Sequence, residues 1–347
     1  MIKIQKNVDL SKLNTLALSS QTSDFIEITD SKQIKFAVDY AKQQQLSIFV
    51  LSGGSNLLLP ENFQALTLHM QNLGTEILEH TSEYVIVKAE AGEIWHHFVC
   101  DCTTKGFYGL ENLALIPGYV GASPIQNIGA YGAEAGEFIQ DIWAYDTQSD
   151  ADVILNASEC QFGYRDSIFK QQAGRYIIYA VSFKLSRKPQ LKLNYADVAQ
   201  RVGDQATPQK LLSTIVEIRK NKLPQPEQYP NAGSFFKNPI LSNDAFQQFS
   251  AQYPNAPHYP QADGRVKVAA GWLIEQAGWK GKKLGVVGMF EKQALVLVNY
   301  GQATLEDVKN AYYHIQDDVF EKFAITLEPE PVLLNQHGHV QAHRRVL

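Results

Sequence analysis

Alternating apolar and polar residues predict short strands and amphipathic helices from near the start of the chain. Residues 24–59 favour a strand, a helix and a second strand, SIFVL, that runs directly into GGSN. Within the expected helix, Ile34, Val38 and Ala41 lie on one face, and Ser31 is the expected N-cap.

The same patterns continue through the first half. EYVIVKAEAG (83–92) and RYIIYAVSFKL (175–185) predict strands, and EIWHHFVCDCTTKG (93–106) predicts a helix. Cys100 and Cys102 would point to nearly opposite sides of that helix, so we expect a packing role for them.

The composition changes near 186–230, where Pro224, Pro226 and Pro230 interrupt regular structure. A helix is predicted in TPQKLLSTIVEIRKNKLP just before these prolines. We therefore expect a new domain to begin around 205–225.

Helices and strands resume after the prolines. KVAAGWLIEQAGWKGKKLG predicts a helix that stops at Gly278, and KQALVLVNY predicts a buried strand. TLEDVKNAYYHIQDDVFEKF predicts a long helix that opens with a capping box of Thr304 and Asp307. AITLEPEPVLL is strand-like and, if extended, places Glu328 and Glu330 on one face.

Composition narrows the class of protein. With 347 residues, the chain is longer than one compact core usually holds. A content of 45% apolar and 19% charged residues is typical of a folded soluble protein. The net charge is −5 without a long run of one sign, which argues against nucleic acid as a partner. Three cysteines in no zinc or disulfide spacing favour a reducing compartment, and no apolar stretch predicts a signal peptide or membrane span. We expect a cytoplasmic protein.

Two glycine-rich segments are candidates for binding an anion. GGSN (53–56) follows a strand directly, and IPGYVGASPIQNIGAYGAEAG (116–136) is too rich in glycine for a regular element. Such loops can point several N–H groups at one diphosphate. The alternatives are an ordinary turn for the first and a loop wrapping a neighbouring domain for the second. The chain has neither G-x-G-x-x-G nor G-x-x-x-x-G-K-[ST], which disfavours a Rossmann site or a P-loop.

Single polar residues allow more than one interpretation. Arg165 in FGYRDSIFK is either a surface or salt-bridged arginine or a site residue, and the two acids of LEPE are either a solvated edge or catalytic groups. Ser234 in NAGSFF lacks the G-x-S-x-G turn of a Ser-His-Asp hydrolase. The adjacent His96 and His97 cannot both face one metal from a helix, and no metal site is predicted.

Taken in order, the motifs resemble those of the UDP-N-acetylenolpyruvoylglucosamine reductases, the MurB family. They are GGSNLLL, IPGYVGASPIQNIGAYG, FGYRDSIFK, IRKNKLP, NAGSFFKNP, AAGWLIEQAGWKG, QALVLVN and LEPE. The resemblance spans about residues 12–334 and depends on several independent motifs in the same order.

The resemblance implies an α+β fold, with a two-subdomain FAD-binding fold of the vanillyl-alcohol-oxidase (PCMH) type and a third α+β substrate-binding domain. The implied division is 1–70 and 71–204 for the FAD-binding subdomains, 205–322 for the substrate-binding domain and 323–347 for a C-terminal strand segment with the catalytic glutamate.

The resemblance also implies the site residues. Non-covalent FAD would contact Gly53, Gly54, Ser55, Asn56, Leu57, Ile116, Pro117, Gly118, Gly121, Ser123, Gln126, Asn127, Gly129, Ala130, Tyr131 and Arg219. The UDP-sugar would contact Tyr164, Tyr195, Lys222, Asn238, Lys280 and Gln293, with Tyr195 matching the tyrosine of the longer, type I members.

The implied reaction has two stages. NADPH reduces FAD and is replaced by UDP-N-acetylglucosamine enolpyruvate, whose vinyl group then receives hydride from N5 of the reduced flavin. Arg165 and Glu330 match the pair that stabilises the enolate-like carboxylate, and Ser234 matches the residue that protonates carbon. A monomer with no membrane partner is expected.

The chain departs from the family pattern at two positions. Phe290 stands where a histidine is expected, and Val332 follows LEPE where an arginine is common. These changes bear on uridine or diphosphate contacts. Two rival classes remain, a different flavin oxidase with the same FAD fold and a nucleotide-sugar binding protein without activity.

Overall fold

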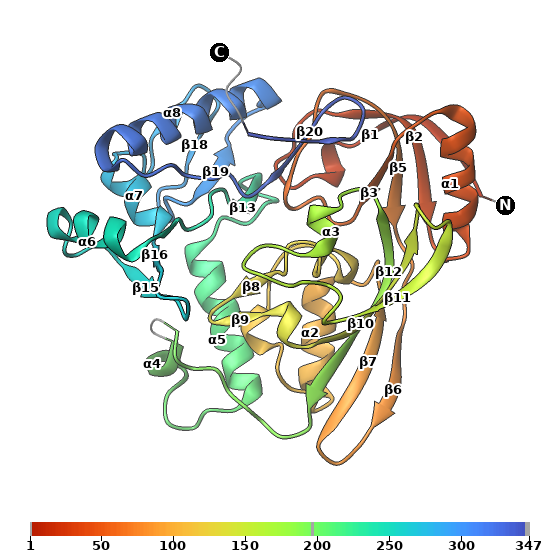
Figure 1. Ribbon diagram of the computed structural model, residues 1–347, viewed down its shortest axis with the longest axis horizontal. Helices are drawn as coiled ribbons and strands as arrows, with labels where there is room; N and C mark the ends of the chain where they lie inside the picture. The colour runs from red at the N-terminus through yellow and green to blue at the C-terminus, as the bar shows by residue number, and fades with distance from the viewer. Residues whose placement is uncertain (1, 196–197, 344–347) are drawn as a thin grey trace.

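The computed structural model of the protein describes residues 2–195 and 198–343. Figure 1 shows three lobes: the N-terminal lobe at the upper right, a second lobe below it and a third at the upper left. The last described segment crosses from the third lobe back to the first.

The first lobe is built on a four-stranded sheet in the order β1-β2-β5-β3. Strand β2 runs parallel to β5, and β5 parallel to β3, whereas β1 pairs antiparallel with β2. Helix α1 buries Ile34, Ala37, Val38 and Ala41 against this sheet. The elements are β1 (Gln5–Asp9), β2 (Gln21–Ile28), α1 (Gln33–Gln44), β3 (Ile48–Leu51), β4 (Leu57–Leu58) and β5 (Asn62–Met70).

The second lobe contains a five-stranded antiparallel sheet in the order β11-β10-β12-β7-β6. Trp95, Phe98 and Phe183 pack together in its core, to which α5 also contributes. Its elements are β6 (Thr75–His80), β7 (Tyr84–Glu90), α2 (Trp95–Thr104), β8 (Gly129–Ala130), β9 (Ala133–Glu134), β10 (Ile139–Asp146), β11 (Ala151–Asn156), α3 (Ile168–Gln171), β12 (Tyr176–Ser186), α4 (Val198–Val202) and α5 (Pro208–Lys222).

The third lobe combines two small sheets with three helices. The sheets have the orders β13-β19-β18-β17 and β14-β16-β15, and Phe235, Trp279 and Tyr312 lie at the centre of the packing. Its elements are β13 (Asn231–Ser234), β14 (Ile240–Leu241), α6 (Asn243–Gln252), β15 (His258–Pro260), β16 (Val266–Val268), α7 (Ala270–Gln276), β17 (Lys283–Leu284), β18 (Val287–Met289), β19 (Val296–Asn299) and α8 (Leu305–Phe323).

The segment after α8 joins the third lobe to the first. Strand β20 (Val332–Leu334) pairs in parallel with β4 and antiparallel with β21 (Val340–Gln341). The expected strand over AITLEPEPVLL was therefore too long, because Pro329 and Pro331 have no N–H to donate to a neighbouring strand. Glu328 and Glu330 also differ in environment, with side chains 68% and 13% exposed.

Helix ends give one confirmed and one wrong prediction. In α8, Thr304 accepts the N–H of Asp307 while the Asp307 carboxylate accepts the N–H of Thr304, which is the predicted capping box. Helix α1 begins after Lys32 without a side-chain cap, so Ser31 is not its N-cap. The Gln33 side chain accepts the N–H of Thr29 instead, and this bond satisfies the turn that precedes the helix.

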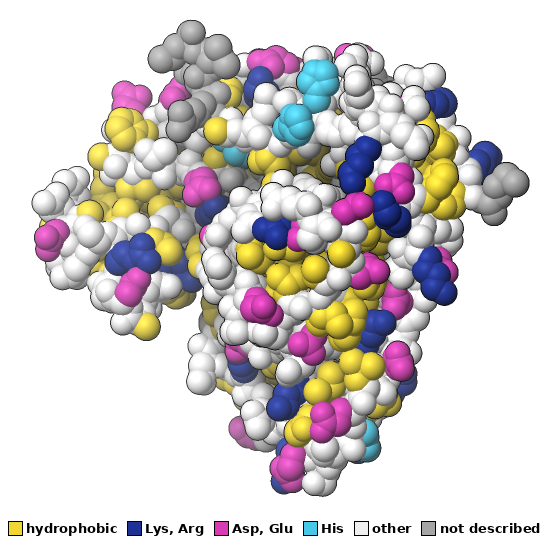
Figure 2. Space-filling view, turned by 45° about the vertical axis from the view of Figure 1, so that its right-hand side comes forward, with side chains coloured by type: hydrophobic (Ala, Val, Ile, Leu, Met, Phe, Trp, Pro, Cys, Tyr) yellow, Lys and Arg dark blue, Asp and Glu magenta, His cyan; other side chains and the backbone are white. Residues whose placement is uncertain are grey.

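The remaining predictions from composition concern the cysteines, membrane-spanning helices and the distribution of charge. Cys100 is half-buried and Cys102 is buried in the core of the second lobe, consistent with packing. Within residues 2–195 and 198–343, no helix is long and apolar enough to cross a bilayer. On the face seen in Figure 2, basic and acidic side chains are interspersed.

The capping box predicts a measurable contribution to stability. Thr304→Ala should reduce the free energy of unfolding by about 1 kcal/mol, because the N–H of Asp307 loses its acceptor. Thermal unfolding of the purified protein checks this value. Thr304→Ser keeps the hydroxyl and should unfold close to the unsubstituted protein, and equal losses in both variants would contradict the capping role.

Candidate active site

Two glycine loops meet backbone to backbone between the first and second lobes. A Cβ atom on Gly53 would lie 2.8 Å from the Cα of Gly118, so neither a side chain nor a water fits between them. Ser55 also links the loops, because its Oγ donates to the carbonyl of Pro117 (3.2 Å). The two predicted anion-binding segments, 53–56 and 116–136, therefore form a single surface.

Glycine is required at particular positions of this surface. Gly54 has φ +60°, and a Cβ there would lie 2.0 Å from the carbonyl oxygen of Leu13. Gly118 has φ +114°. Beside them, the Oγ of Ser52 is buried and has no hydrogen-bond partner in the described part of the chain. Closely packed loop backbones with few side chains, together with an orphaned hydroxyl, suit a polar cofactor such as a diphosphate.

The rest of the 116–136 segment is held by its own hydrogen bonds. Asn127, at φ 47°, donates to Glu134 (2.8 Å) and to the carbonyl of Gly163 (3.1 Å), and it accepts the N–H of Gly136. The buried Ser123 donates to the carbonyl of Val120 (2.7 Å). These two predicted FAD contacts therefore shape the loop as well.

The other predicted cofactor residues lie in or beside the same loops. Gly121 packs so closely on Ala91 that a Cβ would come within 2.5 Å of the alanine Cβ. Arg219, in the last turn of α5, donates from Nε to the carbonyl of Leu115 (3.2 Å), and its burial lowers the pKa of the guanidinium. Leu57 lies in β4, while Ile116, Gly129, Ala130 and Tyr131 are half-buried in the loop.

Arg165 and Glu330 form an ion pair between the second lobe and the C-terminal segment. Arg165 Nε lies 3.4 Å from Glu330 Oε1, and Arg165 Nη2 donates to the carbonyl of Gly129 (2.7 Å). Both side chains are largely buried, with 18% and 13% exposure. The fold thus joins two of the three predicted catalytic residues directly.

Glu330 is also tied to the cofactor loops through amide side chains. Gln126 Nε2 donates to Glu330 Oε1 (3.3 Å), and Asn56 Nδ2 donates to Gln126 Oε1 (3.0 Å). Burial raises the pKa of the Glu330 carboxyl, and the nearby charges of Arg165, Lys170 and Lys237 only partly oppose this effect. A carboxyl with a raised pKa can act as a hydrogen-bond donor.

Ser234 reaches the same place through backbone pairing. The N–H of Glu330 donates to the carbonyl of Phe235 (2.8 Å), and Phe236 forms a bridge with Pro329. Ser234 is exposed at the end of β13, and its hydroxyl has no hydrogen-bond partner within 2–195 and 198–343. Backbone pairing therefore brings the residue after Ser234 against Glu330, and the three predicted catalytic residues come from three separate parts of the sequence.

Aromatic side chains lie where the second and third lobes face each other, and one of them, Tyr164, lies 5.3 Å from the Arg165 guanidinium. Tyr195 stacks on Tyr259 with ring centroids 6.3 Å apart and an interplanar angle of 12°, and it meets Tyr131 edge to face. Lys267 Nζ lies 4.6 Å from the centroid of the Tyr164 ring. Burial and neighbouring tyrosines raise the pKa of Tyr195 to about 12, so its hydroxyl stays protonated.

The other predicted substrate residues divide into two groups. Asn238 accepts the N–H of Ala270, and Gln293 Oε1 lies 3.3 Å from where a Cβ on Gly271 would be, so both flank the first turn of α7. Lys222 is exposed at the end of α5, and Lys280 is exposed and paired with Glu275 (2.8 Å). The described contacts do not join these two lysines to the catalytic group.

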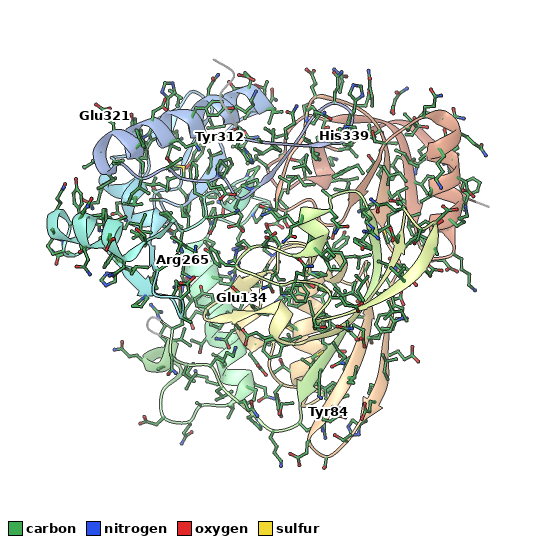
Figure 3. The ribbon with its side chains drawn as sticks, viewed as in Figure 1. Tyr84, Glu134, Arg265, Tyr312, Glu321 and His339 are labelled. Atoms are coloured by element: carbon green, nitrogen blue, oxygen red, sulfur yellow. The ribbon has the colours of Figure 1, made fainter. Side chains whose placement is uncertain are left out.

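Several neighbours of the site were missed from the sequence. Ser52, Lys170 and Lys237 lie in or next to quoted motifs, and that proximity was an available signal. Tyr259 and Lys267 belong to the β15–β16 hairpin, where no motif marks them. Figure 3 labels Glu134, the partner of Asn127, near the middle of the molecule, and Arg265, which lies in the β15–β16 hairpin.

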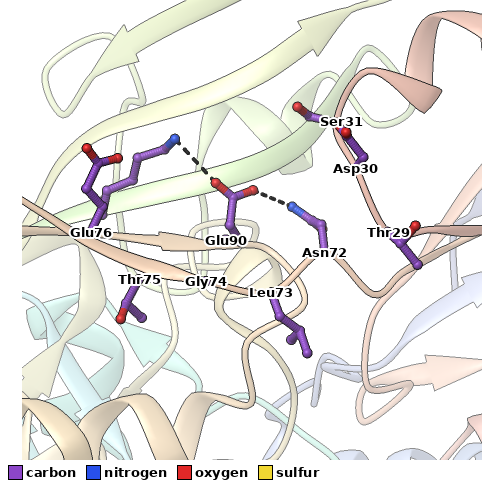
Figure 4. Close-up of a pocket in the computed structure, with 10 residues that line it drawn as sticks. Thr29, Asp30, Ser31, Asn72, Leu73, Gly74, Thr75, Glu76 and Glu90 are labelled. Atoms are coloured by element: carbon purple, nitrogen blue, oxygen red, sulfur yellow. Dashed lines mark hydrogen bonds and ion pairs between the residues drawn. The ribbon is translucent and has the colours of Figure 1, made fainter.

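A separate pocket of about 340 Å³ lies near the junction of the first two lobes. Its wall includes Asn72, which donates to Glu90 (2.7 Å), and Lys88, which lies 3.3 Å from the same carboxylate. Figure 4 shows these paired groups along its wall. None of the predicted site residues lines this pocket.

Comparisons with known proteins show the family to which the chain belongs. Residues 23–147 match a family model described as an FAD binding domain, and residues 225–334 match the UDP-N-acetylenolpyruvoylglucosamine reductase C-terminal domain. A UDP-N-acetylenolpyruvoylglucosamine reductase of Pseudomonas putida is 45% identical over 336 residues, which is 96% of this chain and 99% of the relative. The chain belongs to the UDP-N-acetylenolpyruvoylglucosamine reductase family.

Two further members of this reductase family extend the comparison. The one from Dechloromonas aromatica is 46% identical over 94% of this chain and 98% of its own length. The solved structure of the reductase from Thermus caldophilus superposes with a TM-score of 0.66 at 22% identity, covering 96% of this chain and 99% of that one. The predicted family and fold class are confirmed, while the division into domains and the residue roles stay predictions.

The contact between glycines predicts the effect of one methyl group. Gly53→Ala should weaken FAD binding roughly tenfold or more, because the new Cβ forces the two loops apart. Flavin absorbance per protein after purification, and titration with added FAD, measure the loss. Gly301→Ala is the matched control, since no atom lies within 4 Å of its added Cβ. Full flavin retention in Gly53→Ala would contradict the close approach of the loops.

The environment of Glu330 predicts how stability depends on pH. A folded pKa above the ordinary 4.5 means that the folded state holds this proton more tightly than the unfolded state. The unsubstituted protein should therefore lose stability relative to Glu330→Gln as the pH rises from about 4.5 through the folded pKa. Thermal unfolding of both proteins across this range tests the sign, and a difference that stays constant would exclude a raised pKa.

Proposed function

We propose that this chain catalyses the NADPH-dependent reduction of UDP-N-acetylglucosamine enolpyruvate to UDP-N-acetylmuramate, a step in peptidoglycan precursor synthesis. The relatives that match over nearly the whole chain are reductases named for this substrate. The observation that carries the proposal is the Arg165–Glu330 ion pair beside the backbone pairing of Glu330 with Phe235, the residue after Ser234, because a vinyl-carboxylate reduction needs a charge stabiliser and a proton donor together. The protein acts as a monomer in the cytoplasm.

The two glycine loops hold FAD without a covalent link. Gly53, Gly54 and Gly118 allow the loops to pack closely with few side chains, so that backbone N–H groups can face a diphosphate, and Ser52 and Asn56 offer polar side chains beside it. Bound FAD supplies the redox chemistry, since it accepts hydride from NADPH and provides it to the β-carbon of the enolpyruvyl group. Arg219 holds the Leu115 carbonyl at one side of this loop and contributes positive charge there.

Arg165 and Glu330 stabilise charge on the substrate carboxylate. Addition of hydride at the β-carbon leaves an electron pair on the α-carbon, and this charge spreads into the adjacent carboxylate. The planar guanidinium of Arg165 matches such a group, and its contact with Gly129 fixes its orientation. Burial raises the pKa of Glu330, so this carboxyl is protonated more easily than usual and, once protonated, can donate a second hydrogen bond to the same carboxylate.

Ser234 protonates the α-carbon. A serine hydroxyl is a weak acid, but a carbanion is a strong base, so a correctly placed hydroxyl can transfer its proton. The exposure of Ser234 lets water return the proton to its oxygen. The pairing of Phe235 with Glu330 keeps the serine near the carboxylate-binding groups.

The UDP-sugar lies between the second and third lobes, in contact with Tyr164, Tyr195, Lys222, Asn238, Lys280 and Gln293. The position of Asn238 and Gln293 at the first turn of α7 supports this assignment, as does the stacking of Tyr195 on Tyr259 across the lobes. The departures at Phe290 and Val332 remove two polar groups from the family pattern, so uridine or diphosphate contacts there differ in this chain.

Two measurements separate this proposal from the rival classes. Purified protein should show flavin absorbance, and denaturation should release the flavin, whereas a simple nucleotide-sugar binding protein would be colourless. NADPH oxidation should then depend on added UDP-N-acetylglucosamine enolpyruvate. Flavin-loaded protein that never turns over this substrate would indicate a different flavin oxidase.

The role of Ser234 predicts unequal effects on the two half-reactions. Ser234→Ala should slow oxidation of reduced flavin by the UDP-sugar by about a hundred- to ten-thousandfold, because the general acid is lost. Reduction of the flavin by NADPH should stay within about threefold, since that step needs no proton on carbon. Rapid-mixing absorbance measurements resolve both steps, with Ser213→Ala as the control at an exposed serine of α5. Equal slowing of both steps would refute the assignment.

A further inference from the structure

Lys170 is a half-buried basic residue beside the proposed site to which the mechanism gives no role. It lies in α3, five residues after Arg165, and its Nζ donates to the carbonyl oxygen of Arg165 (2.9 Å). Burial and the neighbouring Lys237 lower the pKa of Lys170. The ammonium groups of Lys170 and Lys237 repel each other, so the placement of Lys170 needs an explanation.

The backbone conformation of Arg165 explains the placement of Lys170. Arg165 has φ 54°, in the left-handed region that residues with a side chain seldom adopt. It lies in a tight turn in which Gly163 and Asp166 exchange backbone hydrogen bonds. A strained conformation persists only when its surroundings hold it in place, and the Lys170 ammonium contacts the carbonyl of that same residue.

This backbone conformation determines where the Arg165 guanidinium starts. From there the side chain reaches the carbonyl of Gly129 and the carboxylate of Glu330. A rotation of the Arg165 peptide would move the guanidinium away from both partners. The bond from Lys170 therefore acts on the reaction through Arg165, without contact to the reacting atoms.

The charges around Lys170 come from several elements. Arg165 and Asp166 lie in the same turn, and Lys237, which is paired with Glu328, approaches from the third lobe. The charge of Lys170 partly opposes the rise in the pKa of Glu330 that burial causes. The charges of Lys170 and Lys237 also lower the pKa of His343. Lys170 thus contributes a positive charge behind the carboxyl group that faces Arg165.

We propose that Lys170 is a positioning residue for the reduction of the enolpyruvyl group. Its ammonium fixes the Arg165 carbonyl, and thereby aims the guanidinium at Glu330 and at the substrate carboxylate. This inference rests on the proposed function, because it assigns Lys170 to the same charge-stabilising step.

Three variants in the flavin-loaded protein test the inference. Lys170→Met removes the ammonium at similar length, Lys170→Arg keeps a cationic donor, and Lys184→Met is the control at an exposed lysine of β12. Lys170→Met should slow oxidation of reduced flavin by the UDP-sugar roughly tenfold to a hundredfold, as expected for misplacement of a catalytic group. Flavin reduction by NADPH should change little, and Lys170→Arg should recover most of the lost rate.

The dependence on pH separates positioning from a merely structural role. Removing the positive charge destabilises the Glu330 carboxylate, so its pKa should rise further in Lys170→Met. The pH profile of the second half-reaction should therefore shift to higher pH in Lys170→Met, and not in Lys170→Arg or Lys184→Met. Substrate titrated into the oxidised protein, followed by flavin absorbance, should bind more weakly to Lys170→Met.

Three results would overturn the inference. In the first, Lys170→Met behaves like Lys184→Met. In the second, both half-reactions fall together with loss of flavin and no shift in the pH profile, which marks a structural residue. In the third, the unsubstituted protein shows no oxidation of reduced flavin by the UDP-sugar. That outcome alone removes the proposed function, and this inference with it.

Discussion

The pairing of two backbone segments, 234–237 and 328–330, is the interaction on which the candidate site depends. The N–H of Glu330 bonds to the carbonyl of Phe235, and the N–H of Lys237 bonds to the carbonyl of Glu328. Phe235 and Phe236 are both buried, so hydrophobic packing holds this pairing in register. The result places a serine from a sheet strand beside a glutamate from the returning C-terminal segment.

At this junction, burial and neighbouring positive charges have opposite effects on the pKa of Glu330. Burial raises the pKa of the Glu330 carboxyl, whereas Arg165 and the two nearby lysines lower it. Burial prevails in the direction of the pKa shift. The carboxyl beside the fixed guanidinium is therefore easier to protonate than an ordinary glutamate, and this combination suits a substrate whose negative charge grows during the proposed reaction.

The sequence allowed local features and the family to be predicted, but not the cross-lobe contacts. Thr304 and Asp307 are three residues apart, so their capping box is visible in the chain, as are the glycines of the two loops. Ser31 does not cap α1, because the turn before the helix is stabilised instead by the Gln33 side chain, which accepts the N–H of Thr29. Tyr259 and Lys267 reach the second lobe only through tertiary packing of a hairpin, and no local pattern encodes that reach.

The parallel pairing of β20 with β4 also bears on how the protein folds. Asn56 and Glu330, which are linked by a hydrogen bond at this junction, are separated by 274 positions in the chain. Closing so long a loop carries a large entropic cost that is repaid only after the three lobes have formed. The candidate site around Glu330 is therefore expected to assemble late, and folding intermediates with native lobes would still lack the pairing of Glu330 with Asn56, Gln126 and Arg165.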